Sequence, residues 1–378
     1  MKNVVIAGYA RSPFTLAKKG ALARIRPDDL AAQVVRELIA RSHVKPEDIE
    51  DIIMGCAFPE GEQGMNVARL IGLLSDLPIS VGGMTVNRFC GSSMQSVHIA
   101  AGAIQMGAGE VFVCAGVESM SRIPLGGYNP MLNPALHQKQ PGAYMGMGDT
   151  AENVARQWQI PRAEQERFAV RSHARAAAAQ SEGKLAGEIV AIRVNGHSID
   201  KDGCIRPETS PEALAGLKPA FDQEGSVTAG TSSPLTDGCA AVLVTTEEYA
   251  QRHNLPMLAR IRSVSVAGCG PKIMGIGPVS ATKKALSRAG IEIGAVDVVE
   301  LNEAFASQAL ASARDIGVRD ETLNIDGGAI ALGHPLGATG ARIVGKAASL
   351  LKRTGGKYAL ATQCIGGGQG IATVLEAI

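Results

Sequence analysis

Residues 84–93 (MTVNRFCGSS) pass from a strand-like segment through a short turn into the start of an amphipathic helix. A second small-residue turn that opens a helix, residues 337–340 (GATG), lies 247 residues after residues 90–93. A strand predicted at residues 49–54 is matched by one at 296–301, again 247 residues later. A fixed spacing between matching elements indicates an internal repeat. We therefore predict one structural unit that the chain uses twice.

The repeated unit alternates strands with helices, which predicts an α/β fold with mostly parallel sheets and helices on their faces. In each copy the helix leads into a strand that ends in a cysteine, Cys114 in the first copy and Cys364 in the second. These cysteines are 250 residues apart, and we expect a loop to absorb the difference from the repeat spacing.

The two copies leave one segment of the chain without a counterpart. Residues 1–118, completed by 234–257, form the predicted N-terminal half, and residues 258–378 form the C-terminal half. Residues 119–233 begin with a turn-rich stretch and continue with helical patterns, one of them directly after a proline suited to a first helical turn. We predict that this segment is an inserted loop domain that lies over one half.

The composition excludes several classes of protein. The 378 residues carry a net charge of +1 and only 3% aromatic residues, which argues against nucleic-acid binding. The hydrophobic fraction of 46% supplies a large core, and no apolar run reaches the length of a membrane span. The seven cysteines include no C-x-x-C pair, so we expect neither a disulfide framework nor a zinc site. A strand at residues 3–8 leaves no room for a targeting segment, and we expect a reduced, cytoplasmic location.

Cys90 lies in the turn before the helix predicted at residues 91–106. Unpaired N–H groups and the positive end of the helix dipole favour a thiolate, so we expect a lowered thiol pKa. The strand–turn–helix order resembles the nucleophile elbow of hydrolases in its logic, though not in its sequence. A buried and inert cysteine is the alternative.

His334 lies between glycine and proline in residues 327–340 (GGAIALGHPLGATG), a segment whose many small residues are a poor setting for a core histidine. By the repeat spacing it corresponds to Asn87, three residues before Cys90. If the two copies face each other across a pseudo-twofold axis, Cys90 and His334 approach one cleft. A neutral imidazole there can take the proton of the thiol.

Two further segments place reactive or polar residues at strand ends. Cys364 precedes residues 365–370 (IGGGQG), whose glycines allow backbone N–H groups to point into a site and stabilise an oxyanion. A dinucleotide-binding fingerprint is excluded there, because no helix opens after these glycines. Asn302 follows a predicted strand, where α/β sheets bind their ligands.

Four segments together resemble the signature blocks of the thiolases. They are residues 87–93 (NRFCGSS), 302–305 (NEAF), 333–337 (GHPLG) and 364–368 (CIGGG). They occur in the order found in that family, and the resemblance covers essentially the whole chain. It implies two α-β-α-β-α halves related by pseudo-twofold symmetry, with a loop domain inserted in the first half. The internal repeat supports this fold independently.

The resemblance also implies roles for the site residues. Cys90 would be the nucleophile that becomes acylated, and His334 would activate it. His334 and a water held by Asn302 would bind the thioester oxygen of the substrate. Cys364 would move the proton at the α-carbon of acetyl-CoA, and the N–H groups of Cys90 and Gly366 would form a second oxyanion hole. The reaction would be ping-pong, with CoA as a cosubstrate and neither a bound cofactor nor a metal.

The same resemblance places CoA contacts on and beside the inserted segment. Arg206 matches the position that packs on the adenine end of CoA, and Ser233 matches a contact to pantetheine. Met147 would line the acyl pocket, with simple core filling as the alternative.

The activity implied is cleavage of a 3-ketoacyl-CoA by CoA to acetyl-CoA and a shortened acyl-CoA, as in fatty-acid β-oxidation. Gly146 stands where biosynthetic acetoacetyl-CoA thiolases typically have histidine, which favours the degradative type. A biosynthetic enzyme restricted to acetoacetyl-CoA is the first alternative. A ketoacyl-carrier-protein synthase, or a non-catalytic lipid carrier of the same fold, is the second. The family implies acyl-CoA partners and a homodimer or homotetramer.

Overall fold

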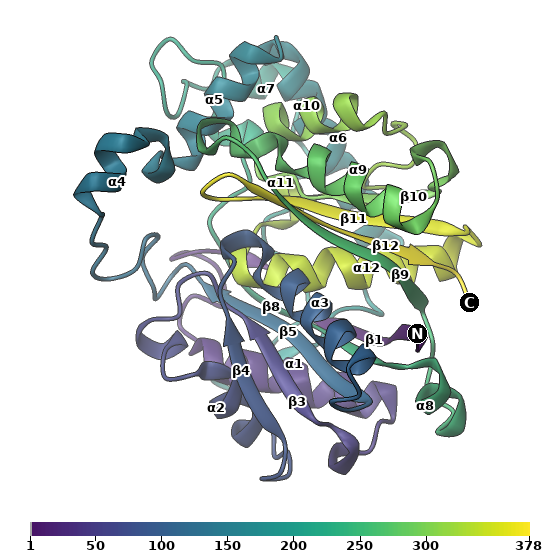
Figure 1. Ribbon diagram of the computed structural model, residues 1–378. Coiled ribbons are helices and arrows are strands. Elements are labelled where there is room, and N and C mark those ends of the chain that lie inside the picture. Colours follow the sequence, from purple (N-terminus) through teal and green to yellow (C-terminus); the bar gives the residue numbers. More distant parts are fainter. Residues whose placement is uncertain (1) are drawn as a thin grey trace.

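The computed structural model describes residues 2–378, which form alternating layers of helix and sheet (Figure 1). The strands of the N-terminal half lie side by side in the order β1 (Val4–Arg11), β8 (Thr236–Thr246), β5 (Val111–Ser119), β3 (Asp51–Gly55) and β4 (Gly82–Val86). A short strand, β2 (Thr15–Leu16), pairs with β8.

The strands of the C-terminal half follow in the order β9 (Ala259–Gly268), β12 (Gln369–Glu376), β11 (Tyr358–Ile365) and β10 (Val298–Leu301). Two residue pairs between β1 and β9, Val5 with Arg260 and Ile6 with Ala259, join both halves into one continuous sheet.

The prediction of mostly parallel sheets is wrong. In the described chain β3 pairs in parallel with β4 and β5, and β10 with β11, whereas β1, β8, β9 and β12 make antiparallel pairs. The connections explain the difference. Strand β8 re-enters the sheet between β1 and β5 after the inserted segment, and β12 follows β11 through a tight hairpin. Gly367 and Gly368 turn this hairpin with φ values of 82° and 90°, which glycine adopts without strain.

Helices form the middle and outer layers. In the middle, α3 (Ser92–Gln105) and α12 (Thr339–Thr354) lie between the two halves of the sheet (Figure 1), and their apolar side chains share one core with strands of both halves. The outer face of the N-terminal half is covered by α1 (Pro27–Ser42) and α2 (Val67–Leu74). The outer face of the C-terminal half is covered by α9 (Gly277–Ala289) and α10 (Ala306–Ile316). The predicted α-β-α-β-α order of layers is therefore confirmed, with the two halves forming one such stack together and sharing its middle layer.

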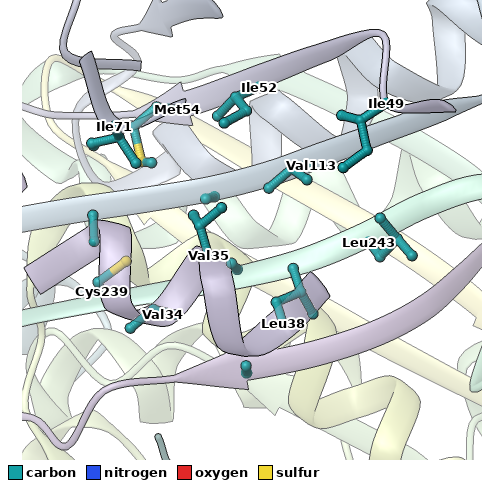
Figure 2. Close-up of a cluster of buried hydrophobic side chains, with 14 of the residues drawn as sticks. Val34, Val35, Leu38, Ile49, Ile52, Met54, Ile71, Val113, Cys239 and Leu243 are labelled. Carbon is teal, nitrogen blue, oxygen red and sulfur yellow. The ribbon is translucent and has the colours of Figure 1, made fainter. Parts of the chain in front are cut away.

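The outer core of the N-terminal half shows how the sequence produces this packing (Figure 2). Val34, Val35 and Leu38 lie on one face of α1 and pack with Leu243 of β8, a helical spacing that makes an apolar stripe. Pro27 occupies the first helical turn, where its missing N–H is not needed. Each fully buried aliphatic side chain contributes about 1.5–3 kcal/mol relative to exposure in water.

The repeat spacing is kept by the elements themselves. Helices α3 and α12 begin at residues 92 and 339, and strands β5 and β11 begin at residues 111 and 358, both 247 residues apart. The expected drift between the copies is therefore wrong, because the counterpart of Cys114 is Ala361. Cys364 lies three residues further along its strand, opposite Val117 in the repeat.

The segment between β5 and β8 adds no strand to the main sheet within the described residues, and its domain boundaries at 119 and 233 stay a prediction. Its longest helix, α6 (Arg162–Ser181), packs Phe168 and Ala169 into the core beneath α10. The other elements of the segment are α4 (Pro134–Lys139), α5 (Met147–Gln157), β6 (Ile192–Val194), β7 (His197–Ile199) and α7 (Pro211–Ala215).

Two short helices complete the chain, α8 (Glu247–Arg252) and α11 (Ala329–Leu332). Among residues 2–378, no helix has both the length and the apolar character needed to cross a membrane.

Candidate active site

Cys90 lies on a tight turn between β4 and α3. Phe89, directly before it, has a φ of 43° in the left-handed region, and residues Phe89–Gly91 form a single 3-10 turn. Ser92 stabilises the turn, since its Oγ donates to Phe89 O at 2.6 Å and accepts from Arg88 N at 2.9 Å. A strained turn between a strand and a helix presents its side chain to a site, as in the nucleophile elbow.

Strand β11 and the hairpin after it hold Cys90 from the other side. The Gly366 backbone N–H lies beside the Cys90 thiol, close enough to lower its pKa in part. The Gln363 side-chain amide donates to the backbone carbonyl of Cys90. A Cβ on Gly91 would lie only 2.6 Å from Ile365 Cδ1, so the turn and the strand pack closely.

The prediction of a lowered thiol pKa for Cys90 is wrong for the free protein. Burial raises the pKa of Cys90 to about 11, the backbone N–H groups of Gly366 and Cys90 lower it in part, and the Glu118 charge raises it. Desolvation therefore outweighs the helix terminus. Cys90 is a neutral thiol near pH 7, and it needs a base to become a nucleophile.

His334 has the protonation state of such a base. Thr339 Oγ1 donates its hydrogen to Pro335 O at 3.0 Å, so it accepts from His334 Nδ1–H at 2.6 Å. This network assigns the proton to Nδ1 and leaves the lone pair on Nε2. Burial, followed by the nearby Arg342 cation, lowers the pKa of His334 to about 3. The imidazole is neutral, and Nε2 has the lone pair that can accept a proton.

Asn302 contacts the same imidazole nitrogen. Its Nδ2 lies 3.4 Å from His334 Nε2, and its backbone N donates to Thr362 O in β11 at 3.0 Å. Asn302 Oδ1 is buried and has no hydrogen-bond partner among the described residues. A buried acceptor of this kind is suited to bind a donor group from outside the protein.

Cys364 lies near the end of β11 in an apolar setting, packed with Met147, Met274 and Ala304. Burial raises the pKa of Cys364 well above its usual range, and neighbouring Cys90 raises it further. The two thiols therefore lie close together, and both are protonated near neutral pH.

The structure gathers the predicted catalytic residues in two adjoining groups. Cys90, Cys364 and Gly366 form one group, and His334 and Asn302 form the other. Two contacts join the groups: the hydrogen bond between Asn302 and Thr362, described above, and a hydrogen bond from Ala341 N in α12 to Ser93 Oγ in α3 at 2.8 Å.

The three residues predicted to contact CoA lie at different distances from the catalytic groups. Met147 begins α5, and its Sδ would be 3.4 Å from a Cβ on Gly366, so it borders the site. Ser233 is half-buried, and its backbone N–H donates to Ala304 O at 2.9 Å. Ala304 is two residues after Asn302, so this bond places Ser233 near the site. Arg206 is exposed, and its backbone N donates to His173 Nδ1 at 3.1 Å. The structure shows no contact of Arg206 with the catalytic groups among residues 2–378.

Sequence reasoning missed three residues that hold the site together, namely Thr339, Gln363 and Glu118. Glu118 offered a signal, because it is an acid at the end of a uniformly apolar strand, residues 111–117 (VFVCAGV). An open groove of about 1160 Å³ between α1 and the β6–β7 hairpin is lined by none of the predicted site residues.

Comparison with known families decides what this arrangement belongs to. The model described as "Thiolase, N-terminal domain" matches residues 4–248, and "Thiolase, C-terminal domain" matches residues 255–377. The chain belongs to the thiolase family. The thiolases are acyltransferases, and the family division falls between residues 248 and 255, so the inserted segment is part of the N-terminal thiolase domain.

Relatives within the thiolase family match over the full length. A 3-ketoacyl-CoA thiolase of Bacillus subtilis (strain 168) is 45% identical, and one of Vibrio vulnificus (strain CMCP6) is 48% identical, each over 100% of both chains. The crystal structure of human mitochondrial 3-ketoacyl-CoA thiolase in complex with CoA superposes with a TM-score of 0.92 at 37% identity, over 100% of this chain and 98% of that one. The thiolase fold predicted from the sequence is confirmed.

Proposed function

We propose that this chain is a 3-ketoacyl-CoA thiolase that uses CoA to cleave its substrate into acetyl-CoA and an acyl-CoA two carbons shorter. The observation that supports it best is the pair of neighbouring thiols, the half-buried Cys90 and the buried Cys364, with the Gly366 N–H beside the nucleophile's sulfur. Two thiols in one site can serve as nucleophile and as acid, which is what cleavage of a carbon–carbon bond beside a thioester requires. The names of the full-length relatives support the same substrate class.

The first half-reaction forms an acyl-enzyme. The Cys90 proton moves to His334 Nε2, and the thiolate attacks the 3-keto carbon. The resulting oxyanion accepts from the N–H groups of Cys90 and Gly366, a type of stabilisation worth about 2.7–4 kcal/mol per donor. The bond between C2 and C3 then breaks. The electron pair leaves on C2 as an acetyl-CoA enolate, whose oxygen is bound by His334 and by a water at Asn302, and Cys364 donates its proton to C2.

The second half-reaction releases the acyl group. Cys364, now a thiolate, takes the proton of an incoming CoA thiol, and the CoA sulfur attacks the thioester on Cys90. Cys90 leaves and recovers its proton from His334. Every proton is returned to its starting residue. The high pKa of Cys364 is suited to the first step, because a weak acid is a neutral thiol until the carbanion forms.

CoA contacts, chain length and pathway belong to the same proposal. The human relative was solved in complex with CoA, which supports CoA binding by this chain. From the sequence resemblance we propose a pantetheine contact at Ser233, an adenine contact at Arg206 and an acyl pocket beside Met147. At the position where acetoacetyl-CoA enzymes typically have histidine, this chain has Gly146, so we propose the degradative type. We further propose that the enzyme acts in fatty-acid β-oxidation in the cytoplasm.

We further propose a homodimer that forms along β4. This strand is the last in the order of the N-terminal half, so one edge of its backbone faces outward. Ile79, just before it, and Met84, within it, are 82% and 38% exposed. An unpaired strand edge flanked by exposed apolar side chains is suited to pair with a second copy. Light scattering with size-exclusion chromatography distinguishes this dimer from the alternatives of monomer and tetramer.

The experiment that tests the function is CoA-dependent cleavage of a series of 3-ketoacyl-CoAs, from acetoacetyl-CoA to long chains, with Cys90→Ala as the inactive control. Turnover of medium and long chains is the expected result. Turnover of acetoacetyl-CoA alone moves the assignment to the biosynthetic type. Activity that depends on malonyl thioesters would indicate a ketoacyl-carrier-protein synthase, and no turnover at all would favour the lipid carrier.

A further inference from the structure

Glu118 is a buried carboxylate at the end of β5, with 1% of its surface exposed. Its Oε2 accepts from Ala57 N and from Gly337 N, each at 2.8 Å. Its Oε1 accepts from Gln63 Nε2 at 2.8 Å and from Phe58 N at 3.3 Å. These four partners are N–H donors, and a fifth, the Cys56 thiol, donates to Oε1 at 3.7 Å, so the ionised carboxylate is the form that satisfies them.

Two of these donors belong to the segment that supports the nucleophile's turn. Ala57 O accepts from Asn87 Nδ2 at 3.0 Å, and Asn87 Oδ1 accepts from Phe89 N at 2.9 Å. The rings of Phe58 and Phe89 pack with their centroids 6.0 Å apart. Through residues 57 and 58, Glu118 therefore holds the residues directly before Cys90.

Gly337, the donor on the other side, lies in the histidine loop, between His334 and Thr339. Backbone meets backbone at this point, because a Cβ on Gly337 would lie 2.8 Å from Gly55 O and from Val117 O. A Cβ on Gly116 would lie 2.0 Å from Gly337 O. The backbone of this loop packs directly against the end of β5, so movement of one segment displaces the other.

We propose that Glu118 is a positioning residue for the thiol and the imidazole. Its carboxylate forms hydrogen bonds both with the segment that supports the Cys90 turn and with the loop that holds His334. It therefore fixes the position of His334 Nε2 relative to the Cys90 thiol. This role rests on the proposed function, in which that proton transfer starts the reaction. Glu118 does not touch the reacting atoms, and it acts through both backbones.

The charge of Glu118 gives it a measurable effect on the pKa of the Cys90 thiol, which a residue with a purely structural role would not have. Within residues 2–378, Glu118 is the charged side chain whose field acts on the Cys90 thiol, and it raises the thiol pKa. Neutralising it lowers that pKa, while the loss of its hydrogen bonds loosens the geometry. Glu118→Gln is therefore expected to shift thiol reactivity to lower pH and, at the same time, to reduce turnover.

The test compares the purified wild-type enzyme with Glu118→Gln, Glu118→Asp and the control Glu152→Gln. Glu152 is also a buried carboxylate, 2% exposed, and accepts from Val227 N at 2.8 Å and Ser226 N at 3.0 Å, but it contacts neither loop. Each protein is assayed for kcat and KM in thiolysis. The rate of Cys90 alkylation by iodoacetamide is measured from pH 7 to 10 by intact mass.

We expect kcat of Glu118→Gln to fall about 10- to 100-fold with KM within about threefold, since misplacement of about 1 Å costs up to 10²-fold in rate. Its alkylation profile should move to lower pH. Glu118→Asp keeps the charge but shortens the reach, so its kcat should fall while its alkylation profile stays unchanged. Glu152→Gln should leave both the profile and kcat close to wild type.

Two results overturn the proposal. One is a kcat within twofold of wild type in both Glu118 variants. The other is an alkylation profile that does not move in Glu118→Gln, or that moves equally in Glu152→Gln. If Glu118→Gln fails to fold, the proposal is tested by Glu118→Asp alone: a fall in its kcat supports the positioning role, and an unchanged kcat refutes it. A wild-type protein without thiolysis activity would instead refute the proposed function, and the positioning role would then be decided by the alkylation profiles.

Discussion

Replacing Thr339 with valine tests whether one hydroxyl determines which nitrogen of His334 is the base. The Thr339 hydroxyl accepts from His334 Nδ1–H at 2.6 Å and donates to Pro335 O at 3.0 Å. Valine fills nearly the same volume but offers no acceptor, so the Nδ1–H group is left buried and unpaired. The reactive tautomer, with its lone pair on Nε2, loses the interaction that selects it.

The expected effect follows from the cost of an unpaired buried donor, about 1–3 kcal/mol. At about 1.36 kcal/mol per tenfold change in rate, kcat should fall about 5- to 150-fold. KM should change by less than about threefold, because Thr339 is fully buried behind the imidazole and does not border the site.

The matched control for this substitution is Thr354→Val on the same helix. Thr354 also donates to the carbonyl four residues earlier, Leu350 O at 2.8 Å, but it lies at the far end of α12. Steady-state thiolysis kinetics and thermal unfolding are measured for both variants. A kcat of Thr339→Val within twofold of wild type, or an equal fall in Thr354→Val, would refute the assignment of Nε2 as the base.

Three further predictions concern stability and the second thiol. Arg342→Met removes the partner of Glu300 at 2.7 Å, and because burial raises the pKa of Glu300 to about 7 even beside Arg342, the carboxyl takes up a proton in the variant. Chemical denaturation at pH 7 should show a loss of about 1–3 kcal/mol, the cost of a buried polar group without its partner, and an unchanged stability would show that the pair contributes little. Burial lowers the pKa of His98 to about 3, so its folded pKa lies below the unfolded value and stability falls as pH drops below about 6.5. The buried neutral His98 lowers the free energy of unfolding of the wild type by about 2 kcal/mol between pH 7 and pH 5. His98→Gln should lack this contribution, so its stability should fall by about 2 kcal/mol less over the same range. Parallel pH profiles of the two proteins would contradict the buried neutral state. Cys364→Ala should lose about 10²–10⁴-fold in thiolysis while acyl-CoA still acylates Cys90 in intact mass spectra, and full activity would remove Cys364 from the mechanism.

The overall fold was predictable because its main signal is an internal repeat in the sequence. The spacing of 247 residues between matching helices and strands is present in the sequence and recurs in α3 and α12. The strand directions were not predictable by the same reasoning. Nothing in β8 itself indicates that it enters between β1 and β5, because that choice depends on where the inserted segment returns the chain.

The candidate site was predicted by residue type and motif, but its electrostatics were not. Cys90 does lie at the start of a helix, which by itself favours a thiolate, yet burial by distant segments raises its pKa to about 11. Cys114 and Cys364 were matched because each was expected to end a strand, although β5 continues past Cys114 to Ser119 and the backbone register pairs Cys364 with Val117.

The supporting residues were missed for a similar reason. Glu118 and Gly337 are 219 residues apart, and Gln363 and Cys90 are 273 apart. Hydrogen bonds across such separations leave no periodic pattern in the sequence. They become visible only when the tertiary structure brings the segments together.

The most direct test of the account is to locate the acyl-enzyme. The protein is mixed with a 3-ketoacyl-CoA in the absence of free CoA, quenched with acid, digested and mapped by mass spectrometry. The account predicts one acyl group, two carbons shorter than the substrate's acyl chain, on Cys90, and no adduct in Cys90→Ala. An acyl group on Cys364 or on any other cysteine in place of Cys90, or no adduct under conditions in which the enzyme turns over with CoA, would contradict it.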